Sequence, residues 1–138
     1  MGVQDINLCI EPGEFVSIVG QSGTGKSTLV KLLIAEERST EGRIDIGGWD
    51  FTRISYNDMT YLRRQIGVIF QDFKLLHQKT VAENIAFALE VAGEARKRIL
   101  SVVPKVLDIV GLSHKKDAYP HQLSGGEQQR VVIARSLV

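Results

Sequence analysis

Apolar residues fall into short continuous runs in the first half of the chain. Residues 14–19 and 65–70 have the length and the Val, Ile and Phe content that are typical of buried strands. Residues 3–10 predict a further strand, and residues 43–46 predict a shorter one that ends at a Gly47-Gly48 turn. We therefore expect the first half of the chain to be rich in strands.

Two helices are expected within the same half. Residues 27–34 carry apolar positions that suit a buried helix. A shorter helix is expected to begin at Asn57 or Asp58, because either side chain can cap a helix N-terminus, and to run through Arg64.

The second half of the chain has a helical pattern. Thr80 can cap a helix over residues 81–92, and Glu83 supplies the acid that completes a capping box three residues later. Residues 94–110 are amphipathic, but Pro104 falls inside them. A proline within a helix removes a hydrogen bond and clashes with the preceding turn, at a cost of ~3 kcal/mol. We therefore expect that helix to kink or break there, with a new helix beginning at the proline.

One stretch between an expected strand and an expected helix fits a phosphate-binding pattern throughout. Residues 20–27 read Gly-Gln-Ser-Gly-Thr-Gly-Lys-Ser, which matches G-x-x-x-x-G-K-[ST]. The three glycines let the backbone wrap around phosphate groups without Cβ clashes. Lys26 would place its ammonium against the β- and γ-phosphates of a nucleotide, and the Ser27 hydroxyl would bind Mg²⁺.

A second candidate for phosphate binding lies near the other end of the sequence. Residues 123–130 read Leu-Ser-Gly-Gly-Glu-Gln-Gln-Arg, with a serine and two glycines at an expected helix start. The unpaired N–H groups of a helix N-terminus attract phosphate. Taken alone, the stretch is equally typical of an ordinary helix cap. The upstream phosphate loop favours the phosphate-binding interpretation.

Composition narrows the class of protein. The chain has 138 residues, 43% of them hydrophobic and 24% charged, which is typical of one globular domain. Its net charge of +1 gives no electrostatic reason to expect nucleic acid or an anionic membrane surface as a ligand. The single cysteine, Cys9, excludes an internal disulfide and is expected to be a small buried side chain. No apolar stretch approaches the ~20 residues that span a bilayer, so any membrane role requires a partner chain.

The phosphate loop, Gln71 after a buried run and the octapeptide at residues 123–130 occur in the order found in ABC-type ATP-binding domains. The chain resembles this family over essentially its whole length. The resemblance implies an α/β fold: a P-loop NTPase core with a parallel sheet, a small N-terminal β subdomain and a helical subdomain that carries the signature motif. It implies one incomplete domain, divided into a β-rich core (residues 1–70), the Gln71 loop and helical subdomain (71–123), and the signature motif with its helix (124–138).

The resemblance also implies ATP and Mg²⁺ as cofactors. In that family the loop at Gln71 touches both the metal site and the membrane partner, so Ser27 and Gln71 are the expected metal ligands. The signature motif binds the γ-phosphate of ATP held by the opposite subunit, so a homodimer is expected. The residues expected to contact ATP are Gly20, Gln21, Ser22, Gly23, Thr24, Gly25, Lys26, Ser27, Thr28, Ser124, Gly125, Gly126 and Gln128.

Several features of the family are missing from these residues. The aromatic residue that stacks on adenine precedes the first strand in the family. The metal-binding Asp, the Glu that polarises water and the switch His follow the signature helix, so no catalytic residue is assigned and all are expected beyond Val138. One missing strand would lie beside residues 14–19, so we expect this chain to be poorly folded alone or a fragment of a longer protein. Five residues do not fit the missing roles: Asp108, Asp117, His77, His114 and His121.

A finer resemblance indicates the branch of the family that acts in bacterial cell division. It rests on residues 61–73, Leu75-Leu76 and residues 80–84, and above all on Asp72 directly after Gln71. That branch pairs with an integral-membrane protein to control cell-wall hydrolases. A peripheral location at the cytoplasmic face of the membrane is therefore expected. Asp72 carries no such information if it is only a solvated loop residue.

Other functions stay open. The ATPase subunit of an amino-acid importer or a lipoprotein exporter has the same fold. A soluble member that acts on nucleic acid or ribosomes is disfavoured, because the interval from Gln71 to Ser124 is too short for a long coiled coil and one cysteine cannot form a four-cysteine zinc module. No nucleic-acid partner is expected. A nucleotide-binding fragment without turnover is the remaining interpretation.

Overall fold

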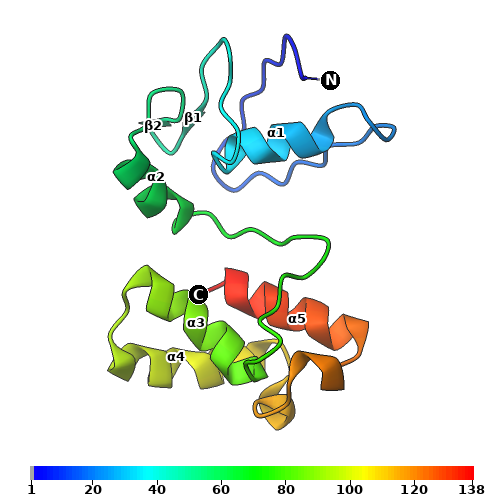
Figure 1. Cartoon of the computed structure of the whole chain (residues 1–138), viewed down its shortest axis with the longest axis vertical. Helices are drawn as coiled ribbons and strands as arrows, with labels where there is room; N and C mark the ends of the chain where they lie inside the picture. Colours follow the sequence, from blue (N-terminus) through cyan, green and yellow to red (C-terminus); the bar gives the residue numbers. More distant parts are fainter. Residues whose placement is uncertain (1) are drawn as a thin grey trace. The chain divides into compact units, whose positions relative to one another are not determined.

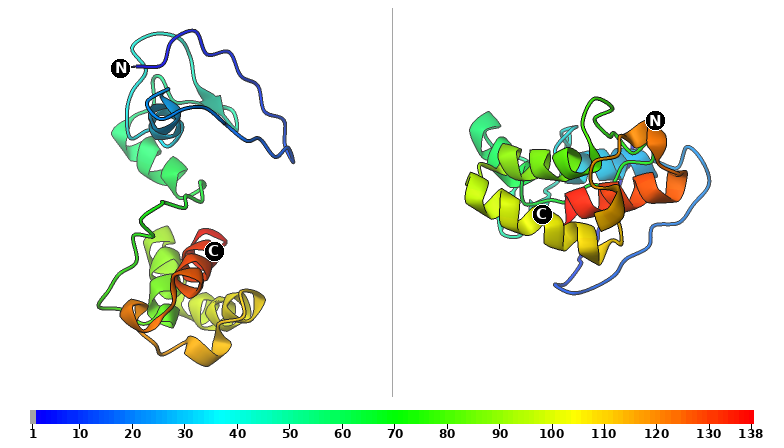
Figure 2. Two further views of the ribbon diagram at one scale, coloured as in Figure 1. Left: turned by 90° about the vertical axis from the view of Figure 1, so that its right-hand side faces the viewer. Right: turned by 90° about the horizontal axis from the view of Figure 1, so that it is seen from below.

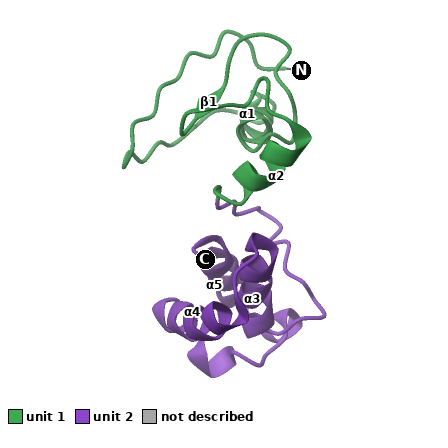
Figure 3. Ribbon diagram, turned by 90° about the vertical axis from the view of Figure 1, so that its left-hand side faces the viewer, with its two compact units in different colours: residues 1–66 green, residues 67–138 purple. Residues whose placement is uncertain are grey.

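The computed structural model describes residues 2–138 and divides into two compact units, one ending at Ile66 and the other beginning at Gly67 (Figures 1 and 3). Unit 1 contains α1 (Lys26–Leu33), β1 (Asp45–Ile46), β2 (Trp49–Asp50) and α2 (Tyr56–Arg63). Unit 2 contains α3 (Val81–Ala92), α4 (Arg96–Ile109), the 3₁₀ turns η1 (Ser113–Lys115) and η2 (Pro120–Gln122), and α5 (Gly125–Ser136).

A small antiparallel hairpin is the one sheet formed by the described residues. β1 and β2 pair with Ile46 opposite Trp49. Gly47 and Gly48 make the turn with φ angles of +59° and +83°, a region of backbone space that favours glycine. The prediction for residues 43–46 is therefore confirmed for the second half of that segment and for the turn that follows it.

The strands expected at residues 3–10, 14–19 and 65–70 are not formed. A strand is held by backbone hydrogen bonds to a neighbouring strand, and within the described part of the chain none of these three segments pairs with another. Their apolar side chains remain in solvent: Phe15 is 96% exposed and Val19 86% exposed. The only backbone pairing of strands among residues 2–138 is therefore the β1–β2 hairpin.

Two predictions of burial in unit 1 are wrong for the same reason. Cys9 is exposed rather than buried. The helix expected at residues 27–34 is present as α1, but no residue of α1 is fully buried. Both predictions assumed a sheet that would cover these side chains, and the described residues contain no such sheet.

Unit 1 is held together around the hairpin and α2. Arg63, in the last turn of α2, donates from Nε to the Ile34 carbonyl at 3.1 Å and from Nη2 to the Ala35 carbonyl at 2.7 Å. These bonds join the end of α2 to the segment that follows α1. The buried residues of this unit are Ala35, Phe51, Met59 and Leu62.

Helix α2 begins at a different residue from the one expected. Ser55 is the N-cap, with an extended backbone and a hydroxyl that accepts from the Asp58 N–H at 3.2 Å. Asn57 and Asp58 already lie inside the helix, so the prediction that one of them caps it is wrong. Ser55 takes the capping role because its hydroxyl reaches the unpaired backbone N–H three residues later. Arg64 is the C-cap, close to the expected end.

Unit 2 is a three-helix arrangement in which α3 packs against both α4 and α5 (Figure 2). The predicted capping box at the start of α3 is confirmed, because Thr80 N–H donates to Glu83 Oε2 at 2.7 Å and Glu83 N–H donates to Thr80 Oγ1 at 3.3 Å. The core of this unit includes Val81, Ile85, Leu107, Leu112, Val131 and Val132.

Helix α4 runs through Pro104 without a break, so the new helix predicted to begin at the proline is not formed. Pro104 lies on the exposed side of the helix. Leu100, four residues before Pro104, is 67% exposed, so this side of the helix faces solvent. Val103 and Leu107 are buried on the other side, and their packing holds the helix continuous.

A buried asparagine shapes the loop that leads into α3. Asn84 is fully buried, and its Oδ1 accepts from the Leu76 N–H at 2.8 Å. Its Nδ2 lies 3.1, 3.0 and 2.9 Å from the carbonyl oxygens of Leu76, Lys79 and Thr80. A buried side chain that satisfies several backbone groups fixes the loop conformation, because each lost partner would leave a polar group without a hydrogen bond.

Candidate nucleotide-binding site

Residues 20–25 form a tight loop that leads into α1. Gly23 and Gly25 have φ angles of +85° and +91°, which residues with a Cβ rarely adopt. A Cβ on Gly25 would also collide with Cγ1 of Val3. Gly25 is the N-cap, and no side chain of residues 2–138 caps this helix. The N–H groups of its first turn therefore remain available to an anion.

Lys26 lies in the first turn of α1, and its side chain folds back over the loop. Its Nζ donates to the carbonyl oxygens of Gly20 at 2.8 Å and Gln21 at 2.6 Å, and lies 3.4 Å from Thr24 Oγ1. A positive charge is thereby held beside a helix N-terminus, whose dipole also favours anions. The loop combines two features that attract phosphate.

The other polar residues of the loop are accessible. Gln21, Ser22 and Ser27 are exposed, and Thr28 is half-buried. Gln71 is exposed in a turn of unit 2. Ser27 and Gln71 offer neutral oxygen donors of the kind that Mg²⁺ accepts. Among the described residues, no three His, Cys, Asp or Glu side chains lie where they could together hold a metal ion.

The octapeptide at residues 123–130 forms the start of α5. Ser124 is the N-cap: its Oγ accepts from the Glu127 N–H at 3.3 Å, and its own N–H donates to Glu127 Oε2 at 2.8 Å. A Cβ added to Gly125 or to Gly126 would meet nothing within 4 Å. The first turn of α5 therefore presents open backbone to an approaching group, and the helix starts at the serine and two glycines as expected.

Gln128, which the sequence assigns to ATP, makes contacts within its own unit. Its Nε2 donates to the carbonyl oxygens of Pro120 at 3.1 Å and Leu123 at 3.2 Å. These bonds tie the segment before the octapeptide to the first turn of α5. In this structure Gln128 therefore fixes the loop that positions Ser124.

Lowering the pH should weaken the capping box at the start of α5 by removing the bonds to the Glu127 carboxylate. The backbone N–H of Ser124, and after it the Ser124 hydroxyl, donate to the Glu127 carboxylate and hold the pKa of Glu127 below its usual range. Because the pKa in the folded state is the lower one, this bond stabilises the fold above the ordinary glutamate value of ~4.3. Its contribution is lost as the pH falls through the folded-state pKa.

An NMR titration of the Glu127 carboxyl carbon measures this effect. The midpoint should lie below the ordinary value of ~4.3, and it should rise toward that value in the Ser124→Ala variant, which lacks the hydroxyl donor. Identical midpoints in the two proteins would contradict the hydrogen bond that the Ser124 hydroxyl donates to the Glu127 carboxylate.

Sequence reasoning missed one residue that binds the backbone shortly after Gln71. Arg135, in the last turn of α5, donates to the carbonyl oxygens of Lys74 and Phe73. The two partners are 61 and 62 positions away in the sequence, and no local pattern indicates such a contact. Asp72, the residue on which the finer resemblance chiefly rests, is exposed, and its carboxylate lies 2.6 Å from Lys74 Nζ.

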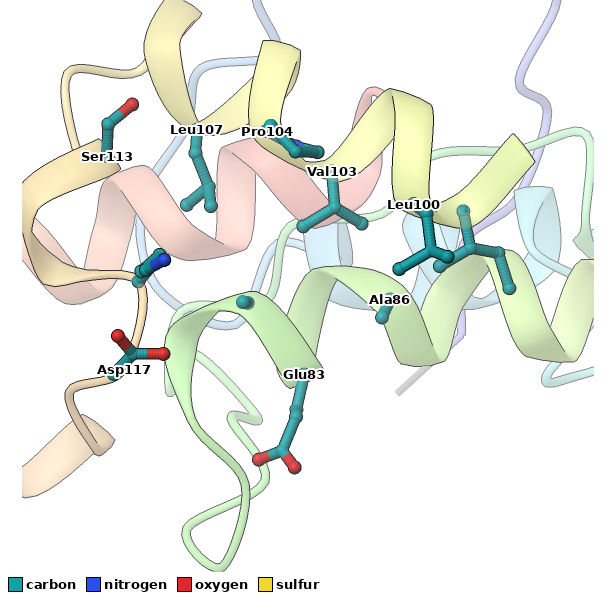
Figure 4. Close-up of a pocket in the computed structure, with 11 residues that line it drawn as sticks. Glu83, Ala86, Leu100, Val103, Pro104, Leu107, Ser113 and Asp117 are labelled. Atoms are coloured by element: carbon teal, nitrogen blue, oxygen red, sulfur yellow. The ribbon is translucent and has the colours of Figure 1, made fainter. Parts of the chain in front are cut away.

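Unit 2 also contains an apolar cavity of about 420 Å³ between α3 and α4 (Figure 4). Glu83, Lys116 and Asp117 contribute its charged groups. None of the residues assigned to the nucleotide or the metal lines this cavity, so it is distinct from the candidate site. Its apolar lining comes from Ala82, Ala86, Ile99, Leu100, Val103, Pro104 and Leu107.

A glycine loop that ends in an uncapped helix, with a lysine over its carbonyls, defines a nucleotide-binding protein of the P-loop class. The sequence profile described as "ABC transporter" matches residues 3–138. The chain therefore belongs to the ABC transporter family, as the sequence motifs predict.

Curated relatives of two kinds are similar to this chain. The cell division ATP-binding protein FtsE of Bacillus subtilis is 55% identical over 133 residues, and the match covers 96% of this chain and 58% of that protein. FtsE of Streptococcus pneumoniae serotype 2 is 48% identical over 136 residues, covering 99% and 59%. The methionine import ATP-binding protein MetN of Geobacillus kaustophilus is 48% identical over 135 residues, covering 98% and 40%.

Solved structures confirm the predicted fold class. The ATP-binding cassette MJ0796, solved as a dimer bound to ADP and Pi, superposes with a TM-score of 0.85 at 36% identity. The match covers 96% of this chain and 59% of that one. The chain thus spans less than two thirds of the length of these relatives.

Within residues 2–138, no helix combines the length and apolar character needed to cross a membrane.

Proposed function

We propose that this chain is the ATP-binding part of an ABC ATPase that works as a dimer. The observation that carries the proposal is the position of Lys26 Nζ, 2.8 and 2.6 Å from the Gly20 and Gln21 carbonyls, beside the uncapped start of α1. The β- and γ-phosphates of a nucleotide are the anions that such a loop binds. ATP bound there would exchange part of the lysine's contacts with the loop for contacts with phosphate.

The octapeptide supplies the second half of the site, from the other subunit. Ser124, Gly125 and Gly126 present a helix N-terminus with open space around the glycines. In the proposed dimer this terminus contacts the γ-phosphate of ATP held by the partner subunit's glycine loop. The dimeric state of MJ0796 supports this arrangement. The two halves would close on ATP and separate once the γ-phosphate is released.

Hydrolysis of ATP is proposed for the whole protein. This chain matches only 58–59% of the length of the FtsE relatives. Ser27 and Gln71 would hold Mg²⁺, which neutralises charge on the phosphate oxygens when bound. The described residues bind and orient the nucleotide. We assign to none of them the task of activating water.

We further propose that ATP binding acts on an FtsX-like integral-membrane partner in bacterial cell division, at the cytoplasmic face of the membrane. The FtsE relatives, at 48–55% identity, support this assignment. Asp72 after Gln71 is a second point of support from the sequence. The methionine-import relatives reach 48–49% identity, so the ATPase subunit of an importer is the second candidate.

Affinity purification of the tagged protein from detergent-solubilised membranes separates the two candidates. We expect recovery of a membrane protein with four predicted spans and a large extracytoplasmic loop. The same purification of the Lys26→Ala protein controls for dependence on nucleotide. Recovery of a permease from an import operon in place of that protein would contradict the cell-division assignment and favour the importer.

A further inference from the structure

The segment after Gln71 has an unusual backbone. Phe73 and Lys74 adopt φ angles of +59° and +47°, two consecutive side-chain-bearing residues in the left-handed region. A bulky residue in that region is uncommon and persists only where neighbouring contacts hold it. The structure must therefore contain a group that keeps these two residues in place.

Arg135 is the group from a distant part of the chain that holds them, in addition to local contacts such as the Asp72–Lys74 ion pair. Its Nη1 donates to the Lys74 carbonyl at 2.7 Å, and its Nη2 donates to the Phe73 carbonyl at 3.2 Å. The two arms of one planar guanidinium thus bind two consecutive carbonyls, a geometry that the arginine fork provides and a lysine does not. Arg135 is partly buried, so water competes less for these bonds than at an open surface.

A second contact joins the same helix end to the chain before Gln71. A Cβ on Gly67 would lie 2.7 Å from the Ser136 carbonyl oxygen, so only glycine lets the two backbones approach this closely. Adjacent residues at the end of α5 therefore contact both ends of residues 67–74, which we call the Gln71 loop.

We propose that Arg135 is a positioning residue that makes the Gln71 loop move together with the signature helix. The inference rests on the proposed function, which places the start of α5 on the partner's ATP and Gln71 at the metal. Helix α5 is a continuous 12-residue rod that begins at the octapeptide and ends at Arg135 and Ser136. A displacement at Ser124 on ATP binding therefore reaches the Gln71 loop through the two contacts at the other end.

Hydrogen exchange followed by mass spectrometry on the intact protein tests the linkage. In the wild type, a non-hydrolysable ATP analogue should slow amide exchange in the Gln71 loop. In Arg135→Ala this slowing should be lost, while the dissociation constant of the analogue changes by less than about twofold, because the phosphate loop is untouched.

Steady-state kinetics supply a second measurement. Arg135→Ala should lower kcat by about tenfold or more with KM nearly unchanged, because two charge-assisted hydrogen bonds to the loop are lost. Arg135→Lys should give an intermediate kcat, since an ammonium lacks the planar fork. Lys105→Ala is the matched control: it removes an exposed cation from α4 in the same unit and should keep wild-type kcat.

Two results would overturn the inference: exchange in the Gln71 loop that still slows with nucleotide in Arg135→Ala, or a kcat for Arg135→Ala equal to that of Lys105→Ala. Gly67→Ala disturbs the other contact and should show the same loss of nucleotide-induced slowing, so the test survives if Arg135→Ala does not fold. A wild-type protein that fails to bind the analogue refutes the proposed function instead, and binding is measured directly.

Discussion

Replacing Lys26 by alanine in the intact protein should abolish ATP binding at physiological concentrations. Lys26 Nζ lies over the carbonyls of Gly20 and Gln21 and is the cation of the glycine loop. Without it, the phosphate oxygens lose a charge-assisted partner, and we expect the dissociation constant to rise by about a hundredfold or more. Isothermal titration calorimetry with MgATP measures the change.

Lys31→Ala is the matched control for that measurement. Lys31 lies in the last turn of the same helix and pairs with Glu37 at 3.2 Å, away from the loop. An exposed ion pair of this kind contributes little to stability, about 0–1 kcal/mol. The control should bind MgATP as the wild type does. Equal affinities for Lys26→Ala and the wild type would refute the assignment of the phosphate loop.

Replacing Ser124 by arginine should leave ATP binding intact and stop turnover. The phosphate loop lies in the other unit of the chain and is unchanged by this substitution. A long cationic side chain at the open first turn of α5 would fill the space that the partner's γ-phosphate requires. We expect the dissociation constant to stay within about threefold and kcat to fall by about a hundredfold, as when a donor to the reacting phosphoryl group is lost.

Loss of the helix cap is a second consequence of that change, and Ser124→Gly isolates it. Glycine at an N-cap costs only a few tenths of a kcal/mol relative to serine, whereas alanine costs ~1 kcal/mol. Glycine also keeps the space around Gly125 and Gly126 open. Ser124→Gly should therefore retain most of the turnover. A Ser124→Arg protein that turns over ATP at the wild-type rate would show that the octapeptide is not part of the ATP site.

Local sequence signals predicted the helices of unit 2 well. The Thr80–Glu83 capping box and the extent of α3 were predictable because a cap and its partner lie three residues apart. Helix α2 shows the limit of such signals: Ser55, Asn57 and Asp58 are all suitable caps, and only the backbone conformation distinguishes Ser55. The predicted start of a new helix at Pro104 was wrong, because packing of the opposite face of α4 outweighs the local cost of the proline.

Features that depend on distant residues were beyond prediction from local pattern. The apolar runs at residues 3–10, 14–19 and 65–70 have the composition of strands. A strand forms only by hydrogen bonding to a neighbouring strand, and no described segment pairs with these three runs. The contact between Arg135 and the Phe73–Lys74 carbonyls joins residues about 60 positions apart and carries no signature of its own. The glycine loop could be predicted from the sequence because all its phosphate-binding residues lie within eight consecutive positions.

The central claim is that the glycine loop of one subunit and the octapeptide of the other form one ATP site. ATP turnover by two purified mixed dimers of the intact protein tests it most directly. One dimer pairs a Lys26→Ala subunit with a Ser124→Arg subunit, and the other pairs a doubly substituted subunit with a wild-type subunit. If the site is shared, the first dimer retains one intact site and turns over ATP, whereas the second retains none. Turnover by the second dimer and not the first would contradict the claim, because it would place both halves of each site within a single subunit.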